Sequence, residues 1–193
     1  MKTRIALALA TALVLPTLAI AGNMTDKQAA QQTAAATPVK SDAEAVAVLM
    51  GVNDHEIRAS QMAQKKGVSP AVMDYANMMV KEHGDNQAKI ISLAGAQSVT
   101  PAETEGVKAL KAKKQTMRDE LSLLEPAKFE AAFLKAMVKD HTEVLAKLDK
   151  ELIPAAKNAA VAQHLRDTRM HVAMHLEKAK SLAGDKNVNL DQE

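Results

Sequence analysis

Apolar side chains recur every three or four residues over residues 41–184, a spacing that places them on one face of an α-helix. Ala, Leu, Met, Lys and Glu dominate this stretch and runs of β-branched residues are scarce, so all of it is predicted to be helical. Cap and turn residues divide it into five predicted helices, over residues 42–66, 70–95, 102–124, 126–153 and 158–183. Four of them carry an apolar stripe wide enough to face a core, whereas the third is mainly polar.

Prolines and a glycine mark most of the predicted boundaries. Pro70, Pro101 and Pro126 each stand where a helix is predicted to begin, a position at which proline is favoured because its missing N–H has no intrahelical partner there. Pro154 and Gly184 are predicted to end the fourth and the fifth helix.

The lengths of the connections predict how the helices are arranged. The first two helices and the last two are joined by short turns, so each pair is expected to form an antiparallel hairpin. The third helix is then a long helical crossover between the hairpins. We therefore predict an all-α fold, with two antiparallel helix hairpins joined by this crossover in the layout of a ferritin-like four-helix bundle over residues 41–184.

One short phrase occurs twice in the chain. Residues 79–83 read MVKEH and residues 137–141 read MVKDH, and AKI at 88–90 matches AKL at 146–148 in the same register. The repeat indicates that one helical unit is present twice and that both copies place a histidine at the same structural position.

The two ends of the chain differ from the helical part. Residues 1–21 combine an early basic pair, a short apolar run and an A-x-A site, which is typical of a cleaved signal peptide. Residues 22–40 are predicted to be a flexible tether because they are rich in Thr, Gln and Ala without apolar periodicity. Residues 185–193 form a polar tail. The predicted location is the periplasm or outer envelope of a bacterium, and no transmembrane segment is expected after signal removal.

Charge and composition exclude one class of partner. Of 25 basic residues, Lys2 and Arg4 lie in the predicted signal peptide, which leaves 23 against 23 acidic residues. A neutral chain with one Tyr, two Phe and no Trp has neither a basic surface nor stacking platforms for nucleic acid. The absence of cysteine excludes disulfides.

Each of the four apolar stripes contains one ionisable residue, and these residues are the candidate site: Glu56, His83, His141 and His175. At ~1.5 Å rise per residue their levels along the helices agree to within one or two turns, so they are expected to meet in the middle of the bundle. His171 precedes His175 by four residues, a spacing at which two imidazoles can bind one metal ion. All five residues are candidate metal ligands. Imidazole suits copper or zinc, and the nearby methionines favour copper(I).

Other interpretations of the same residues remain open. The histidines and Glu56 can form a buried polar cluster that only fixes helix register, and Met79 and Met137 are commonly core residues at such positions. His55 and His164 are expected to lie in solvent at the flanks, and residues 108–114 of the third helix form a solvated basic face.

Several segments together resemble a known family. They are the N-terminal signal, the first helix centred on Glu56, and residues 75–83 (YANMMVKEH), 121–129 (LSLLEPAKF), 137–141 (MVKDH) and 175–179 (HLEKA). The chain resembles the bacterial secreted proteins of domain of unknown function 4142, often described as outer-membrane proteins, over about residues 41–183. The resemblance implies a ferritin-like bundle and an envelope location and brings no established activity. Glu82 stands where aspartate is commoner in that family.

The sequence also argues against di-iron chemistry. Carboxylate-bridged di-iron bundles use Glu-x-x-His motifs, but the residue three positions before each stripe histidine is a valine (Val80, Val138 and Val172). No nucleophile motif or phosphate-binding loop is present either. We therefore predict a non-catalytic envelope protein whose histidine-rich centre binds copper or zinc. The alternative is a structural or stress-related envelope interaction module, with an envelope protein partner or outer-membrane association.

Overall fold

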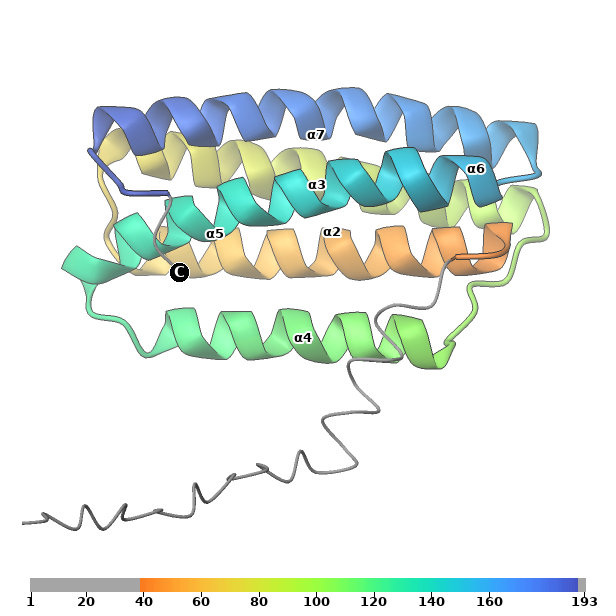
Figure 1. Cartoon of the computed structure of the whole chain (residues 1–193), viewed down its shortest axis with the longest axis horizontal. Helices are drawn as coiled ribbons and strands as arrows, with labels where there is room; N and C mark the ends of the chain where they lie inside the picture. Colours follow the sequence, from red (N-terminus) through yellow and green to blue (C-terminus); the bar gives the residue numbers. More distant parts are fainter. Residues whose placement is uncertain (1–38, 191–193) are drawn as a thin grey trace, which may run out of the picture.

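The structure is a computed structural model that describes residues 39–190 (Figure 1). In this part the chain is all-α, with no strand. The elements are α2 (Asp42–Lys65), α3 (Pro70–Ala96), α4 (Glu105–Ser122), α5 (Pro126–Lys147), the π-helix η1 (Leu148–Leu152), the short α6 (Ile153–Ala155) and α7 (Ala159–Asp185). The predicted signal peptide (1–21) and nearly all of the predicted tether (22–40) lie outside the described residues, as do residues 191–193 of the predicted tail.

The long helices run side by side along one axis and form a single bundle (Figure 1). α2 packs along α3, and α5 packs along α7, which are the two predicted hairpins. The hairpins meet through α3 with α7 and α2 with α5. The crossover helix α4 lies on the outside, against α2 (Figure 1). The predicted all-α bundle is confirmed.

Local capping explains why most helices begin where the sequence predicts. The Ser41 hydroxyl accepts a hydrogen bond from the Glu44 N–H at 3.2 Å, and the Asn158 side chain accepts from the first N–H groups of α7. Pro70 and Pro126 occupy the first turn of α3 and α5. Each of these residues satisfies or removes a backbone donor that a helix start leaves unpaired.

Two predicted boundaries are wrong. The third helix starts at Glu105 rather than at residue 102, because Thr104 provides the cap and the Ala102 N–H donates to the Ala43 carbonyl of α2 at 3.0 Å. Pro154 does not end the fourth helix. It lies in the first turn of α6, which follows α5 through the wider π-turns of η1, so its missing N–H is tolerated.

The core has two apolar parts with a polar layer between them. On α2 the first apolar cluster ends at Val52 and the second begins at Ala59. Between them, and at the corresponding level of the other helices, lie most of the buried polar residues: Asn53, His55, Glu56, His83, Lys114, Arg118, Asp140, His141 and His175. The mid-bundle position predicted for the site is therefore a polar layer in the structure.

Candidate metal centre

Three helices bring one histidine each into this layer. His83 of α3, His141 of α5 and His175 of α7 are all at most 4% exposed. Their ring centroids are 5.9 Å (His83–His141), 5.1 Å (His83–His175) and 5.5 Å (His141–His175) apart. Nitrogens from the three rings, one from each, lie within 4.8 Å of one another. We call these three residues the histidine cluster.

One nitrogen of each ring in the cluster is held by an oxygen. The hydrogen bonds are His83 Nδ1 to Asn53 Oδ1 (2.9 Å), His141 Nδ1 to the Met137 carbonyl (2.8 Å) and His175 Nε2 to Glu82 Oε2 (2.8 Å). Because all three partners are acceptors, the ring nitrogen that faces each of them carries the proton and donates. The tautomer of every ring is thus set by its neighbour, and the second nitrogen keeps its lone pair.

The second nitrogens are buried without a partner among the described residues. They are His83 Nε2, His141 Nε2 and His175 Nδ1. A buried polar atom that makes no hydrogen bond costs about 1–3 kcal/mol. These three nitrogens, on neighbouring rings, are candidate ligands for a metal ion.

Burial keeps these rings uncharged. Desolvation, followed by the neighbouring histidines, places the pKa of His83 well below its usual value. Desolvation lowers the pKa of His141 to about 4, although the Met137 carbonyl and Asp140 act in the opposite direction. Burial likewise lowers the pKa of His175. At neutral pH all three rings are in the neutral form that binds metal ions.

Glu82 is the charged member next to the cluster. Burial acts to raise its pKa, but hydrogen bonds from His175 and His171 outweigh burial and hold the pKa below its usual value. The carboxylate is therefore ionised at neutral pH and gives the His175 ring a negatively charged acceptor.

A second group of buried polar side chains surrounds Asp140, the residue directly before His141 in the sequence. Asp140 Oδ2 accepts from His55 Nε2 at 2.7 Å, and Asp140 Oδ1 lies 2.6 Å from Lys114 Nζ. Arg118 Nη1 donates to His55 Nδ1 at 3.0 Å. Glu56 lies beside His55 and Asp140, with one ligand atom of each within 4.8 Å of the others. Lys114 and Arg118 already provide positive charge here, so the group is a compensated ion network that joins α4 to the bundle.

The structure brings together only part of the predicted site. His83, His141 and His175 form the histidine cluster, whereas Glu56 lies in the adjoining ion network. His171 is 53% exposed, and its Nδ1 lies 3.3 Å from Glu82 Oε2, so it meets His175 only through that carboxylate. Glu56 was predicted to meet the three histidines in mid-bundle; it is buried there but lies outside the histidine cluster, and the roles of Glu56 and His171 as metal ligands stay predictions.

Three residues that were predicted to lie in solvent are buried or half-buried in the structure. His55 was expected in solvent but is 1% exposed, because α4 covers that side of α2. His164 is half-buried. Lys114, assigned to a solvated basic face, points into the bundle and is buried. Met79 and Met137 are buried among apolar side chains, as expected of core residues.

Sequence reasoning missed three residues that hold the buried rings: Asn53, Glu82 and Asp140. Two of them carried a signal. Glu82 and Asp140 occupy the same place in the repeated phrase, directly before its histidine, and each accepts a hydrogen bond from a histidine of another helix. Asn53 had no comparable signal.

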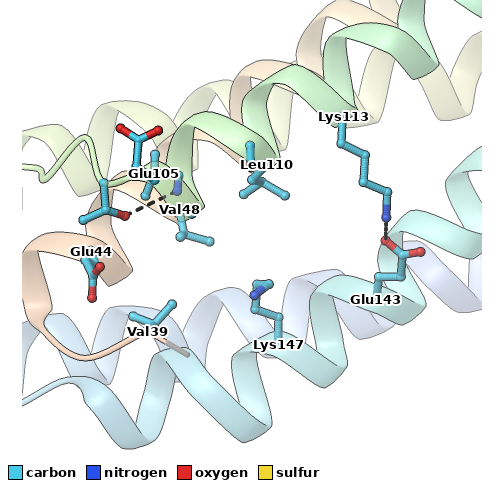
Figure 2. A pocket seen from close by; sticks show the side chains of 12 residues that line it. Val39, Glu44, Val48, Glu105, Leu110, Lys113, Glu143 and Lys147 are labelled. Atoms are coloured by element: carbon cyan, nitrogen blue, oxygen red, sulfur yellow. Dashed lines mark hydrogen bonds and ion pairs between the residues drawn. The ribbon is translucent and has the colours of Figure 1, made fainter. Parts of the chain in front are cut away.

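A separate cavity of about 230 Å³ lies between the start of α2, α4 and α5 (Figure 2). Figure 2 shows Val39, Val48 and Leu110 on its walls and the ion pair of Lys113 with Glu143, 3.1 Å long, at one side. No histidine lines this cavity, so it is unrelated to the histidine cluster.

Fold and site define an all-helical bundle protein with a buried three-histidine centre. The chain belongs to the family described as domain of unknown function (DUF4142), whose model matches residues 26–182. The family resemblance predicted from the sequence is confirmed. Comparisons with curated proteins and with solved structures gave no match. None of the helices within residues 39–190 has the length and apolarity needed to cross a bilayer.

Proposed function

We propose that this protein is a non-catalytic metal-binding protein of the bacterial envelope, with His83, His141 and His175 as ligands of a copper or zinc ion. One observation carries the proposal: three buried imidazoles face one another, each with one nitrogen held by an oxygen and the other without a partner.

The hydrogen-bonding pattern is the one that metal sites need. Histidines that bind metals usually donate their second N–H to a carboxylate or a carbonyl, which orients the ring and raises its basicity. Glu82, the Met137 carbonyl and the Asn53 amide oxygen occupy these places. Three neutral nitrogen ligands suit Zn²⁺ and copper ions and leave one position of a tetrahedral ion for water or another ligand.

The ligand set argues against iron chemistry of the ferritin type and supports storage or transfer of an ion. No carboxylate belongs to the histidine cluster, whereas di-iron centres depend on bridging carboxylates. The cavity lined by His83 and His175, of about 270 Å³, lies near the lower end of the size range of small-molecule sites. The envelope location rests on the signal-peptide pattern of residues 1–21.

Isothermal titration calorimetry of the purified protein with Zn²⁺ and with Cu²⁺ tests the proposal. We expect one ion per chain with a Kd below ~10 μM, a binding free energy of at least about −7 kcal/mol. His141→Ala and His175→Ala should each weaken binding by about 100-fold or more, because each removes a ligand. His164→Ala is the matched control, since this half-buried histidine lies outside the cluster. Helix content measured by circular dichroism confirms that the variants are folded.

A second candidate function is supported by the same hydrogen bonds. Asn53 joins α2 to α3, and Glu82 joins α3 to α7, so the cluster also fixes how the helices pack. A structural or stress-related envelope interaction module needs nothing more. Two results together would distinguish this structural function. The His141→Ala protein would unfold at a lower denaturant concentration, and the wild type would show no specific metal binding.

A further inference from the structure

A cavity between α3 and α7 connects the histidine cluster with the surface. Its volume is about 270 Å³, and four of the six histidines of the chain line it: His83, His164, His171 and His175. His83 and His175 are buried, whereas His171 is exposed. We call this cavity the α3–α7 groove. The path from solvent to the histidine cluster is therefore lined by imidazole side chains.

Glu82 links the outer part of the groove to the inner part. Its Oε2 atom accepts from His175 Nε2 at 2.8 Å and lies 3.3 Å from His171 Nδ1. One carboxylate oxygen thus contacts both an exposed ring and a ligand of the proposed centre. Asp85 and Asp167 also line the groove, together with Lys81 and Lys89, and Lys81 is paired with Asp85.

A metal ion that enters the core requires a binding position between solvent and the histidine cluster. Moving a hydrated ion into the core in one step removes its water before ligands replace it, and an uncompensated buried charge is costly. An exposed imidazole beside an ionised carboxylate can replace part of the water first. His175 and His83 can then replace the rest, and His141, which does not line the groove, completes the set from the interior.

We propose that the α3–α7 groove is the entry route of the metal ion, and that His171 and Glu82 form an outer position where the ion binds before it passes to the histidine cluster. This inference rests on the proposed function. In this inference, His171 affects how fast the metal ion is loaded. Its spacing from His175 had instead suggested that it is a direct ligand of the centre.

Stopped-flow mixing of the protein with Zn²⁺, using a chromophoric chelator as reporter, measures uptake and release. We expect His171→Ala to slow both by about tenfold, the scale of electrostatic and local-concentration effects on association. The equilibrium Kd should stay within about twofold of wild type, because the outer position is crossed in both directions. Met174→Ala is the matched control, since Met174 is exposed on the same helix and does not line the groove.

Glu82→Gln is a second variant that keeps an oxygen able to accept from His175 while removing the charge. It should slow uptake and weaken the dependence of the uptake rate on salt, because less charge attracts the ion. Unchanged salt dependence would contradict the role of the carboxylate in the outer position.

The possible failures separate the two proposals. A wild-type protein that binds neither Zn²⁺ nor Cu²⁺ overturns the proposed function and this inference with it, and a protein that binds Cu²⁺ alone is tested by the same mixing experiment with Cu²⁺. Wild-type binding with unchanged uptake in His171→Ala overturns the entry route alone. A His171→Ala protein that loses as much equilibrium affinity as His175→Ala also overturns it, because His171 would then be a ligand of the centre itself.

Discussion

Glu56 is a carboxyl group in surroundings that hold a charge poorly. Burial, followed by the negative charge of Asp140, raises its pKa to about 7, and His55 and Lys114 offset this only in part. Both of its carboxyl oxygens are buried without a hydrogen-bond partner in the described part of the chain. Near neutral pH, Glu56 is therefore partly protonated and partly ionised.

This raised pKa predicts a pH-dependent difference between wild type and Glu56→Gln. Between pH 4.5 and about 7 the folded protein keeps a proton that the unfolded chain has lost, so this group makes the free energy of unfolding fall as pH rises through that window. Glutamine does not titrate. Relative to wild type, the variant should gain stability from pH 4.5 to 7.5, by at most roughly 3 kcal/mol.

Urea unfolding at several pH values measures this difference. Glu120→Gln, at an exposed position of α4, is the control and should follow the wild-type curve. Parallel stability curves for wild type and Glu56→Gln would contradict the assignment of a raised pKa to this carboxyl group.

At the scale of the elements, α4 is attached to the bundle through buried charges. Lys114 and Arg118 lie one turn apart on α4 and reach Asp140 and His55. Because His55 lies on α2 and Asp140 on α5, these contacts explain why a mainly polar helix packs against both at a fixed place. They also mean that the attachment depends on a few polar side chains rather than on a wide apolar face.

Lys114→Ala should therefore destabilise the protein by about 3–5 kcal/mol, because it leaves the buried Asp140 carboxylate short of a partner. Lys113→Ala, one residue earlier, removes an exposed ion pair with Glu143 and should change stability by less than about 1 kcal/mol. Denaturant unfolding compares the two. Equal effects would show that the buried pair contributes no more than a surface pair does.

The helices themselves could be predicted from the sequence because apolar periodicity and caps are local signals. The position of α4 could not, since a polar pattern does not say which side of a helix will pack, and this is why Lys114 and His55 were misplaced. His171 was misplaced for a related reason. It lies one turn from the buried His175 but at the edge of the apolar stripe, and only the packing of α3 against α7 decides that it remains exposed.

At the scale of the whole molecule, the histidine cluster draws its residues from both hairpins. His83 belongs to the first hairpin, and His141 and His175 belong to the second. An ion that binds this arrangement in the folded protein and binds the unfolded chain less well must stabilise the fold.

Zn²⁺ at 100 times its Kd should raise the free energy of unfolding by about 2.7 kcal/mol. The increase should be visible as a higher midpoint of thermal unfolding and should vanish in His141→Ala. His164→Ala, which keeps the cluster intact, should retain it. A similar increase in His141→Ala would place the stabilising ion somewhere else on the protein.

The order of the three rings along the chain has a consequence for synthesis. His175 lies on α7, after every other long helix, so a polypeptide that stops before α7 contains only two of the three imidazoles. The three nitrogens can therefore meet only after translation has passed His175. Chains that terminate before His175 cannot assemble the full set of three imidazoles.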